Sequence, residues 1–242
     1  MRTKAIKWAR YVSVCPSICG GLCLTFSVLL LYGHGAASKP VSVSEILDRV
    51  QKRYAAADFE ADFVQETYLK AMDTVDTAQG HLYFGRSGMM RWHYKTPEEY
   101  FIISDGDSVW IYRPEENQVM VGRAVDYLGS KKGADFFTRP GELSKEFILE
   151  LAPKALQERD HYALRLVPKT ELPNLVELYL FISKDTFDII KSVTYNAFGD
   201  RTTLRFHSYR FDQRLSSSLF VFEIPNGVEV VQLQGEQDRY EQ

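Results

Sequence analysis

Cysteine is scarce in this chain. Its three copies, Cys15, Cys19 and Cys23, all lie within the first 37 of 242 residues. The rest of the chain can therefore hold no disulfide framework, no zinc–cysteine centre and no thiol nucleophile. The sequence also contains no G-x-S-x-G, P-loop or G-x-G-x-x-G motif. These absences count against a serine hydrolase of the common type, a nucleotide-hydrolysing protein and a dinucleotide-dependent enzyme.

An excess of basic charge is also missing. The chain has 29 Lys and Arg against 32 Asp and Glu, a formal net charge of −3. Four of the basic residues and none of the acidic ones lie in the first 37 residues, so the remainder carries 25 basic and 32 acidic side chains. A domain with this balance is poorly suited to wrapping nucleic acid, and we expect no nucleic-acid partner.

The N-terminal segment has the pattern of a secretory signal peptide. Residues 1–37 begin with basic side chains, continue with an apolar run over residues 22–32 and end in small residues at Ala37. Cleavage there would leave residues 38–242 as a single domain outside the cytoplasm. The alternative is an uncleaved anchor, because residues 11–32 are just long enough to cross a bilayer.

The mature sequence predicts one helix followed by many strands. Ser42 and Glu45 form a capping box, and apolar residues recur at helical spacing over residues 43–56. Residues 125–157 are rich in Gly and Pro and predict a loop followed by one or two short helices. Since no βαβ alternation appears, the fold class is α+β with a large antiparallel sheet. The predicted strands cover residues 58–69, 78–86, 89–95, 99–104, 108–113, 117–122, 161–168, 175–183, 187–196, 201–212 and 219–223.

Two of these strands each have a strongly apolar face. Alternation places Leu82, Phe84 and Arg86 on one face of their strand, and it places Met90 and Trp92 together on the next. A sheet of about ten strands tends to curl, and short helices can cover its concave side. The pattern is compatible with a filled core and with an apolar pocket under a helical lid, and periodicity does not separate the two.

Seven segments follow one another along the chain in a recognisable order. They are ILDRVQKRY (46–54), FEADFVQETY (59–68), QGHLYFGR (79–86), MRWHY (90–94), TPEE (96–99), SDGDSVWIY (104–112) and FVFEIPNGV (220–228). Together they resemble the LolA family of periplasmic carriers of outer-membrane lipoproteins. The resemblance implies an incomplete antiparallel β-barrel of about 10–11 strands with a lid of about three short α-helices over an apolar cavity.

The resemblance also implies a function. A member of this family is a periplasmic carrier without catalytic activity or cofactor, and we expect it to act as a monomer. It would bind the acyl chains of lipoproteins released by an inner-membrane ABC transporter and deliver them to an outer-membrane acceptor lipoprotein. A triacylated protein would otherwise stay in its bilayer, because each buried CH₂ group contributes about 0.8 kcal/mol.

The resemblance, together with the apolar faces, selects five candidate residues. We expect Leu82, Phe84, Met90 and Trp92 to line the acyl-chain cavity through broad dispersion contacts. Arg86 corresponds to the family's lid-holding arginine, and its five N–H donors suit the free carbonyl groups at helix ends. The family commonly has proline after this arginine, where this chain has a serine.

Other polar residues suggest weaker alternatives. His81 and His93 could face each other on neighbouring strands, but two ligands specify a metal poorly, and we expect solvated histidines and no metal site. We also expect a row of carboxylates, Glu60, Asp62 and Glu66, to mark the wet face of a strand. The remaining functional alternatives are another lipid-binding or envelope-sensing module on the same half-barrel scaffold, and a hydrolase with an apolar pocket.

Overall fold

The computed structural model describes residues 41–55, 57–128, 135–138, 143–172, 174–211 and 214–233. The predicted signal peptide lies outside these residues and stays a prediction. Within the described ranges, no helix has the length and apolar character needed to cross a membrane.

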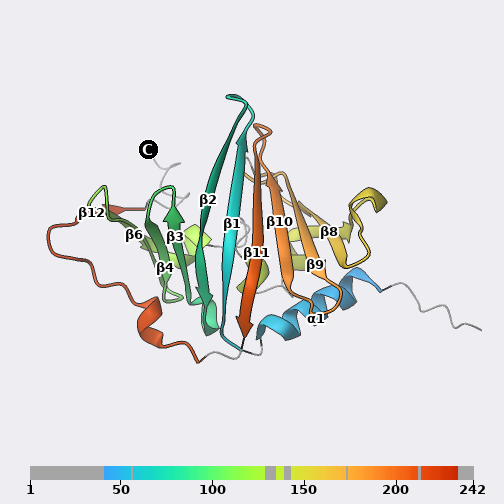
Figure 1. Cartoon of the computed structure of the whole chain (residues 1–242), viewed down its shortest axis with the longest axis horizontal. Coiled ribbons are helices and arrows are strands. Elements are labelled where there is room, and N and C mark those ends of the chain that lie inside the picture. The colour runs from blue at the N-terminus through green and yellow to red at the C-terminus, as the bar shows by residue number, and fades with distance from the viewer. Residues whose placement is uncertain are drawn as a thin grey trace, which may run out of the picture. The chain divides into compact units, whose positions relative to one another are not determined.

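The described chain is dominated by one sheet (Figure 1). Its twelve strands run in the order β12-β6-β5-β4-β3-β2-β1-β11-β10-β9-β8-β7. They are β1 (Phe59–Leu69), β2 (Thr74–Phe84), β3 (Met90–Thr96), β4 (Tyr100–Ser104), β5 (Ser108–Arg113), β6 (Gln118–Arg123), β7 (Phe147–Leu151), β8 (His161–Pro168), β9 (Glu177–Ser183), β10 (Ile189–Tyr195), β11 (Arg201–Phe211) and β12 (Glu229–Gln232).

The sheet is open, with β12 at one edge and β7 at the other. Neighbouring strands are antiparallel except for β12, which pairs in parallel with β6. The two halves of the sheet meet where β1 pairs with β11, so the first and last long strands lie side by side. This arrangement confirms the predicted α+β class and the large, incompletely closed antiparallel sheet.

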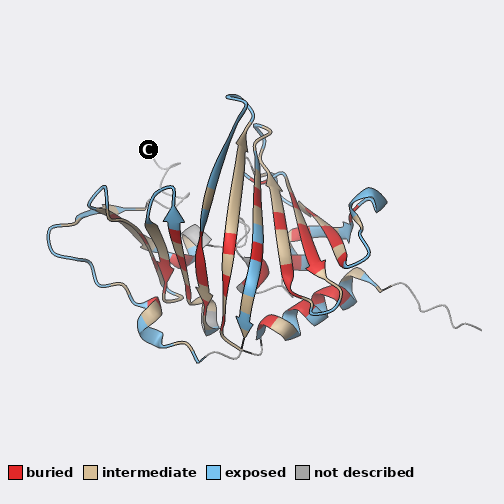
Figure 2. Cartoon of the chain, in the orientation of Figure 1, coloured by how far each residue is buried: buried red, intermediate tan, exposed pale blue. Residues whose placement is uncertain are grey.

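The sheet has one covered face and one outer face. In β3, Met90, Trp92 and Tyr94 are buried while Arg91 and His93 alternate with them on the other side. The buried side chains belong to one large apolar cluster that also contains residues from the helices. We call this side the covered face and the opposite side the outer face. Figure 2 shows the buried residues of the long strands β1 and β2 on the half nearer α1, and further buried residues along one side of α1.

The helices are short apart from the first. α1 (Val43–Ala55) is capped as predicted, since the Glu45 backbone N–H donates to Ser42 Oγ at 3.2 Å. The middle of the chain provides α2 (Ala124–Leu128), α3 (Asp135–Thr138) and α4 (Leu143–Glu146). The sequence predicted one or two helices here, and the described residues contain three. Short 3₁₀ turns are η1 (Arg86–Gly88), η4 (Lys154–Leu156) and η5 (Ser217–Phe220).

The last turn of α1 is fastened to the sheet by directional bonds. The Tyr54 hydroxyl accepts a hydrogen bond from the Ile189 N–H at 2.8 Å. Arg53 Nε donates to Asp188 Oδ1 at 2.8 Å, and the guanidinium lies 3.6 Å from the centre of the Phe211 ring. Burial raises the pKa of Tyr54, so the hydroxyl stays protonated. These contacts hold α1 in place on the sheet. We call α1 and α3, two of the helices whose residues pack into the buried cluster on the covered face, the cover.

Loss of the Tyr54 hydroxyl should destabilise the fold. In Tyr54→Phe the buried Ile189 N–H has lost its acceptor, so we expect the free energy of unfolding to fall by about 1–3 kcal/mol. Urea unfolding measures this directly. The matched change Tyr112→Phe, at a half-buried tyrosine of β5, should cost less than about 0.5 kcal/mol. Equal losses in both variants would show that the hydroxyl does not anchor α1.

The predicted end of the strand at residues 78–86 is wrong. β2 ends at Phe84, and residues 86–88 form η1 rather than the end of a strand. The turn is closed by hydrogen bonds from Gly85 N to Met89 O and from Met89 N to Arg86 O, and Gly88 has a φ of +80°. Glycine is what permits this conformation. Arg86 therefore does not share the strand face of Leu82 and Phe84.

Two further differences concern the ends of the sheet. The predicted strand 219–223 is instead the turn η5 followed by extended chain, because Phe220 packs against Gly85 and Ser216 caps the turn through the Ser218 N–H. β7 and β12, which form the two edges, were not predicted. Both are short strands that pair on one side only.

Candidate functional site

The four apolar residues selected from the sequence meet on the covered face. β2 and β3 pair Leu82 with Trp92 and Phe84 with Met90. All four are buried, with between 0% and 7% of their surface exposed. The Trp92 ring lies 4.9 Å from that of Phe63 and 6.1 Å from that of Phe84. The prediction that they share one apolar face is confirmed.

The side chain of Phe137, in α3, packs against this apolar face. Its ring centre lies 5.1 Å from Phe84, 5.4 Å from Tyr54 and 5.0 Å from Phe206. It is 2% exposed. The Phe137 side chain thus links α3 to α1 and to both halves of the sheet, and these three contacts are between aromatic rings.

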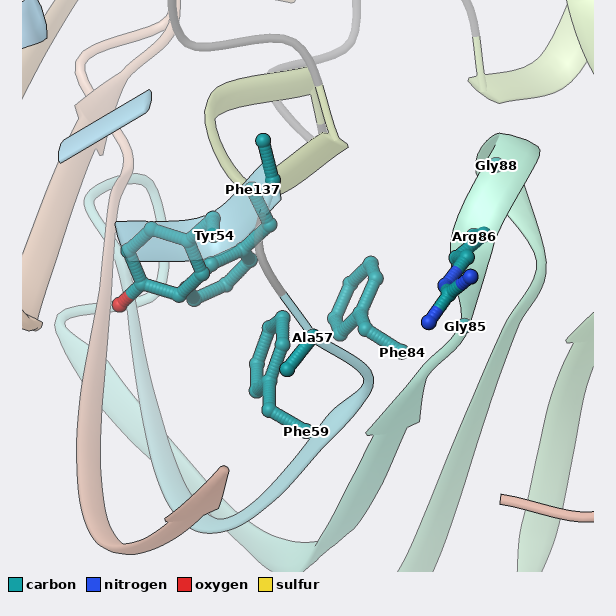
Figure 3. Close-up of a pocket in the computed structure, with 9 residues that line it drawn as sticks. Tyr54, Ala57, Phe59, Phe84, Gly85, Arg86, Gly88 and Phe137 are labelled. Carbon is teal, nitrogen blue, oxygen red and sulfur yellow. The ribbon is translucent and has the colours of Figure 1, made fainter. Parts of the chain in front are cut away.

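A cavity of about 240 Å³ remains beside Phe137 (Figure 3). The rings of Tyr54, Phe59, Phe84 and Phe137 turn toward one another, and Arg86 stands on the opposite side from Tyr54. This volume is below the roughly 300–1,000 Å³ of typical small-molecule sites. Its lining residues are Tyr54, Ala55, Ala57, Phe59, Phe84, Gly85, Arg86, Gly88 and Phe137.

The covered face is therefore mostly filled, with a hollow at one end. Of the predicted cavity residues, Phe84 lines the hollow, whereas Leu82, Met90 and Trp92 lie in the adjoining buried cluster. A longer apolar ligand could reach them only if the cover moved. The sequence left a filled core and a pocket as alternatives, and the structure contains both side by side.

Arg86 lies at the edge of the hollow and is largely solvated. Its side chain is 77% exposed, and Nε lies 3.7 Å from Asp58 Oδ1. Asp58 is mostly buried, and within the described residues that same oxygen has no hydrogen bond. The ion pair places Arg86 between the hollow and the start of β1.

The sequence did not single out Phe137, Tyr54 or Phe59 as site residues. The available signal was the Phe136–Phe137 pair in a segment otherwise poor in apolar residues. Two adjacent aromatics predict an element that inserts into a core, but only the tertiary fold shows which face they enter. Gly85 also has a local role, because a Cβ there would lie 2.9 Å from Phe220.

The histidine pair on the outer face is only partly as expected. His81 and His93 do face each other across β2 and β3. The prediction of solvated histidines is wrong for His81, which is 7% exposed. Its Nδ1 lies 2.7 Å from Asp62 Oδ1 and its Nε2 lies 3.1 Å from Glu60 Oε2. Glu60 also accepts from Arg210, so this part of the carboxylate row is a bonded cluster rather than a wet surface.

This cluster gives stability a defined dependence on pH. A hydrogen bond from His81 lowers the pKa of Asp62. Burial would raise the pKa of Glu60, but hydrogen bonds from Arg210 and His81 outweigh it and lower that pKa. A carboxyl group with a depressed pKa stabilises the fold above its unfolded pKa of about 4, and this contribution is lost as the pH falls through the folded value.

We expect His81→Gln to lower the free energy of unfolding by about 1 kcal/mol at pH 6, a modest value because Asp62 is partly solvated. The difference from wild type should shrink below about pH 4. Urea unfolding at pH 6 and pH 3.5 tests this, with His93→Gln as the control on the same face. A difference that is the same at both pH values would contradict the assigned bonds.

Comparison with known proteins gives concordant results. The family described as "Outer membrane lipoprotein carrier protein LolA" matches residues 55–223. The outer-membrane lipoprotein carrier protein of Nitrosomonas europaea is 29% identical over 208 residues, which cover 86% of this chain and 96% of the relative. That of Nitrosospira multiformis is 29% identical over 177 residues, which cover 73% and 83%.

A solved structure shows a similar fold. An uncharacterized conserved protein from Thermus thermophilus superimposes with a TM-score of 0.52 and 17% identity, covering 78% of this chain and 98% of that one. The similarity between the two proteins is one of fold, that is, of how the sheet and helices are arranged.

Proposed function

Since the chain belongs to the LolA family of outer membrane lipoprotein carrier proteins, we propose that it carries acylated lipoproteins across the periplasm as a monomer. The acyl chains bind between the covered face and α3, and the hollow beside Phe137 is where they enter. The observation that carries this proposal is a cavity lined by four aromatic side chains, next to the buried apolar cluster and under a cover whose central side chain, Phe137, is held by ring contacts.

Acyl chains can replace Phe137 at little cost. The contacts of this ring with Phe84 and Phe206 are apolar and non-directional. A methylene chain lying in the same place would make similar dispersion contacts. Each buried CH₂ group contributes about 0.8 kcal/mol, so several groups suffice to displace one ring.

The part of the cover that moves is α3 rather than α1. α1 is held by the Tyr54 hydrogen bond and by the ion pair between Arg53 and Asp188. Displacement of Phe137 would join the hollow to the buried surfaces of Met90 and Trp92. The cavity would then grow from about 240 Å³ into the range that accommodates a lipid-sized ligand.

The donor and acceptor belong to the same proposal. A carrier with a closed, partly filled site must receive cargo from a protein that supplies the free energy to leave the bilayer, which is the task of an inner-membrane ABC transporter. It must release cargo to a site that binds acyl chains more tightly, which is the task of an outer-membrane acceptor lipoprotein. Broad apolar contacts suit such a carrier because they do not trap the cargo.

Arg86 provides a test of how the cover is controlled. We expect Arg86→Leu to lower the free energy of unfolding by at most about 1 kcal/mol, because the side chain is solvated and its ion pair with Asp58 is long, at 3.7 Å. If Arg86 holds the cover, the same variant should transfer bound lipoprotein to its acceptor at a changed rate. Arg113→Leu, at a partly exposed arginine of β5, is the control. A normal transfer rate would remove Arg86 from the mechanism.

The proposed function itself is tested by comparing a lipoprotein that carries its acyl chains with the same lipoprotein without them. Purified protein should retain a triacylated lipoprotein in a pull-down and should not retain the same lipoprotein without its acyl chains. Mass spectrometry of the retained material should detect the acylated N-terminus. Equal retention of both forms would instead indicate recognition of the protein part, as in an envelope-sensing module.

A further inference from the structure

A second cavity, of about 350 Å³, lies on the outer face and is separate from the acyl-chain site. It is formed across β9, β10, β11 and β1, whose other face carries the buried cluster. Its volume is within the range of small-molecule sites. The lining residues are Glu66, Leu156, Glu177, Tyr179, Phe181, Lys191, Val193, Tyr195, Arg201, Thr203 and Arg205.

The strand register orders these residues in rows. Lys191 of β10 pairs with Phe181 of β9 on one side and with Arg205 of β11 on the other. In the next row Val193 lies between Tyr179 and Thr203. One end of the cavity therefore has two cations from neighbouring strands, and its floor is an apolar and aromatic surface.

One wall is held rigidly in place. Leu156 belongs to η4, which follows β7 and overhangs the outer face. The next residue, Gln157, fixes this turn with three hydrogen bonds to backbone atoms: Nε2 donates to Ala152 O at 3.0 Å and to Ala163 O at 2.7 Å, and Oε1 accepts from Ala163 N at 3.0 Å. The cavity is thus bounded by ordered structure.

The carboxylates of the cavity are already paired. Glu66 binds Arg205 at 2.8 Å, and Glu177 binds Arg165 of β8. Within the described part of the chain, neither Lys191 nor Arg201 has a carboxylate within ion-pair distance. The Lys191 ammonium lies 3.6 Å from the centre of the Phe181 ring, and Glu158 acts on it only from a longer distance. Partial burial and the charge of Arg205 lower the pKa of Lys191.

Lys191 is half-buried and has no carboxylate within ion-pair distance among the described residues. Its neighbour Arg205 is itself paired with Glu66, so the Lys191 charge is the one that lacks a compensating anion. Lys191 and Arg205 are adjacent across the strands, so a group with several negatively charged oxygens can meet both. Tyr179, Val193 and Tyr195 then offer an apolar surface of ligand size beside that group. A phosphate on an organic body has both properties.

We propose that this outer-face cavity binds a phosphate-bearing organic ligand, with the phosphate at Lys191 and Arg205 and the organic body over Val193 and Tyr179. The site is independent of the acyl-chain site, because it lies on the other face of the sheet. The phosphate can come from a lipid headgroup or from a free phosphorylated molecule, and both present the same group to Lys191.

Amide-resolved NMR titration of the full mature chain tests the proposal. The probes are dihexanoylphosphatidylglycerol, a water-soluble lipid phosphate, and glycerol 3-phosphate. Binding at the proposed site should shift the amide signals of Val193 and Thr203 with saturation. Shifts with both probes identify a free phosphate ligand, and shifts with the lipid alone identify a headgroup. Shifts confined to Leu82 and Met90 would place the lipid in the acyl-chain site and would overturn the proposal.

Charge variants complete the test. Lys191→Gln should raise the Kd of the probe by about tenfold or more, since it removes a charge-assisted contact. Lys191→Arg should restore binding, and Lys52→Gln, at an exposed lysine of α1, should leave the Kd unchanged. Arg201→Gln, at the exposed rim, should weaken binding by a smaller factor without disturbing the fold. An unchanged Kd in both Lys191→Gln and Arg201→Gln would refute the site.

Discussion

Replacing Phe84 with glutamate is expected to weaken acyl-chain binding by at least about a hundredfold, because an ionised carboxylate would then stand where methylene groups must pack. Phe84 is 2% exposed and lines the hollow beside Phe137. Because the hollow adjoins solvated Arg86, the new carboxylate can be hydrated there, and the fold should survive with reduced stability. Retention of fluorescent or radiolabelled acylated lipoprotein measures the effect.

The matched control for this variant is Phe84→Met. Methionine keeps an apolar and adaptable side chain at the same place, so binding should stay within a fewfold of wild type. Both proteins are compared at the same folded fraction, determined by urea unfolding. If Phe84→Glu retained acylated lipoprotein as well as Phe84→Met does, the acyl chains would have to bind elsewhere.

Phe137→Ala is expected to change stability and binding in opposite directions. Removal of a ring that is 2% exposed should lower the free energy of unfolding by about 3 kcal/mol. The same change should increase the affinity for acylated lipoprotein, because the acyl chains no longer have to displace the ring. Transfer from this variant to an acceptor should be slower for the same reason.

Phe147→Ala separates these two effects. Phe147 of β7 is equally buried in the same cluster but does not line the hollow. We expect a similar loss of stability with no gain in affinity. A parallel outcome for both variants, with binding lost in proportion to stability, would mean that Phe137 is an ordinary core residue and not the displaceable part of the cover.

The sequence predicted the sheet well where strands alternate clearly between apolar and polar residues. In β3, Met90 and Trp92 alternate with Arg91 and His93, and this pattern alone gave the correct face. The sequence pattern failed at Arg86, because the alternation of β2 continues past Phe84 while the backbone turns in η1, where Gly88 has a φ of +80°. It also failed at β7, since an apolar run of this length has no distinct strand or helix period.

The site itself depended on contacts that a sequence does not contain. Phe137 is 53 residues from Phe84 along the chain, and its place against the covered face follows from tertiary packing. The same holds for His81, which meets Asp62 and Glu60 only through the register of the β1–β2 hairpin. Residue types and faces were predictable, whereas the side chains that close the hollow were not.

The central claim is that acyl chains lie against the covered face of the sheet, and photo-crosslinking tests it most directly. Tyr83 and Phe84 are neighbours in β2 that point to opposite faces. p-Benzoylphenylalanine at each position in turn, irradiated with a lipoprotein that carries labelled acyl chains, compares the two faces within one strand. The account predicts strong labelling from position 84 and none above background from position 83. Equal labelling, or labelling from position 83 alone, would contradict it.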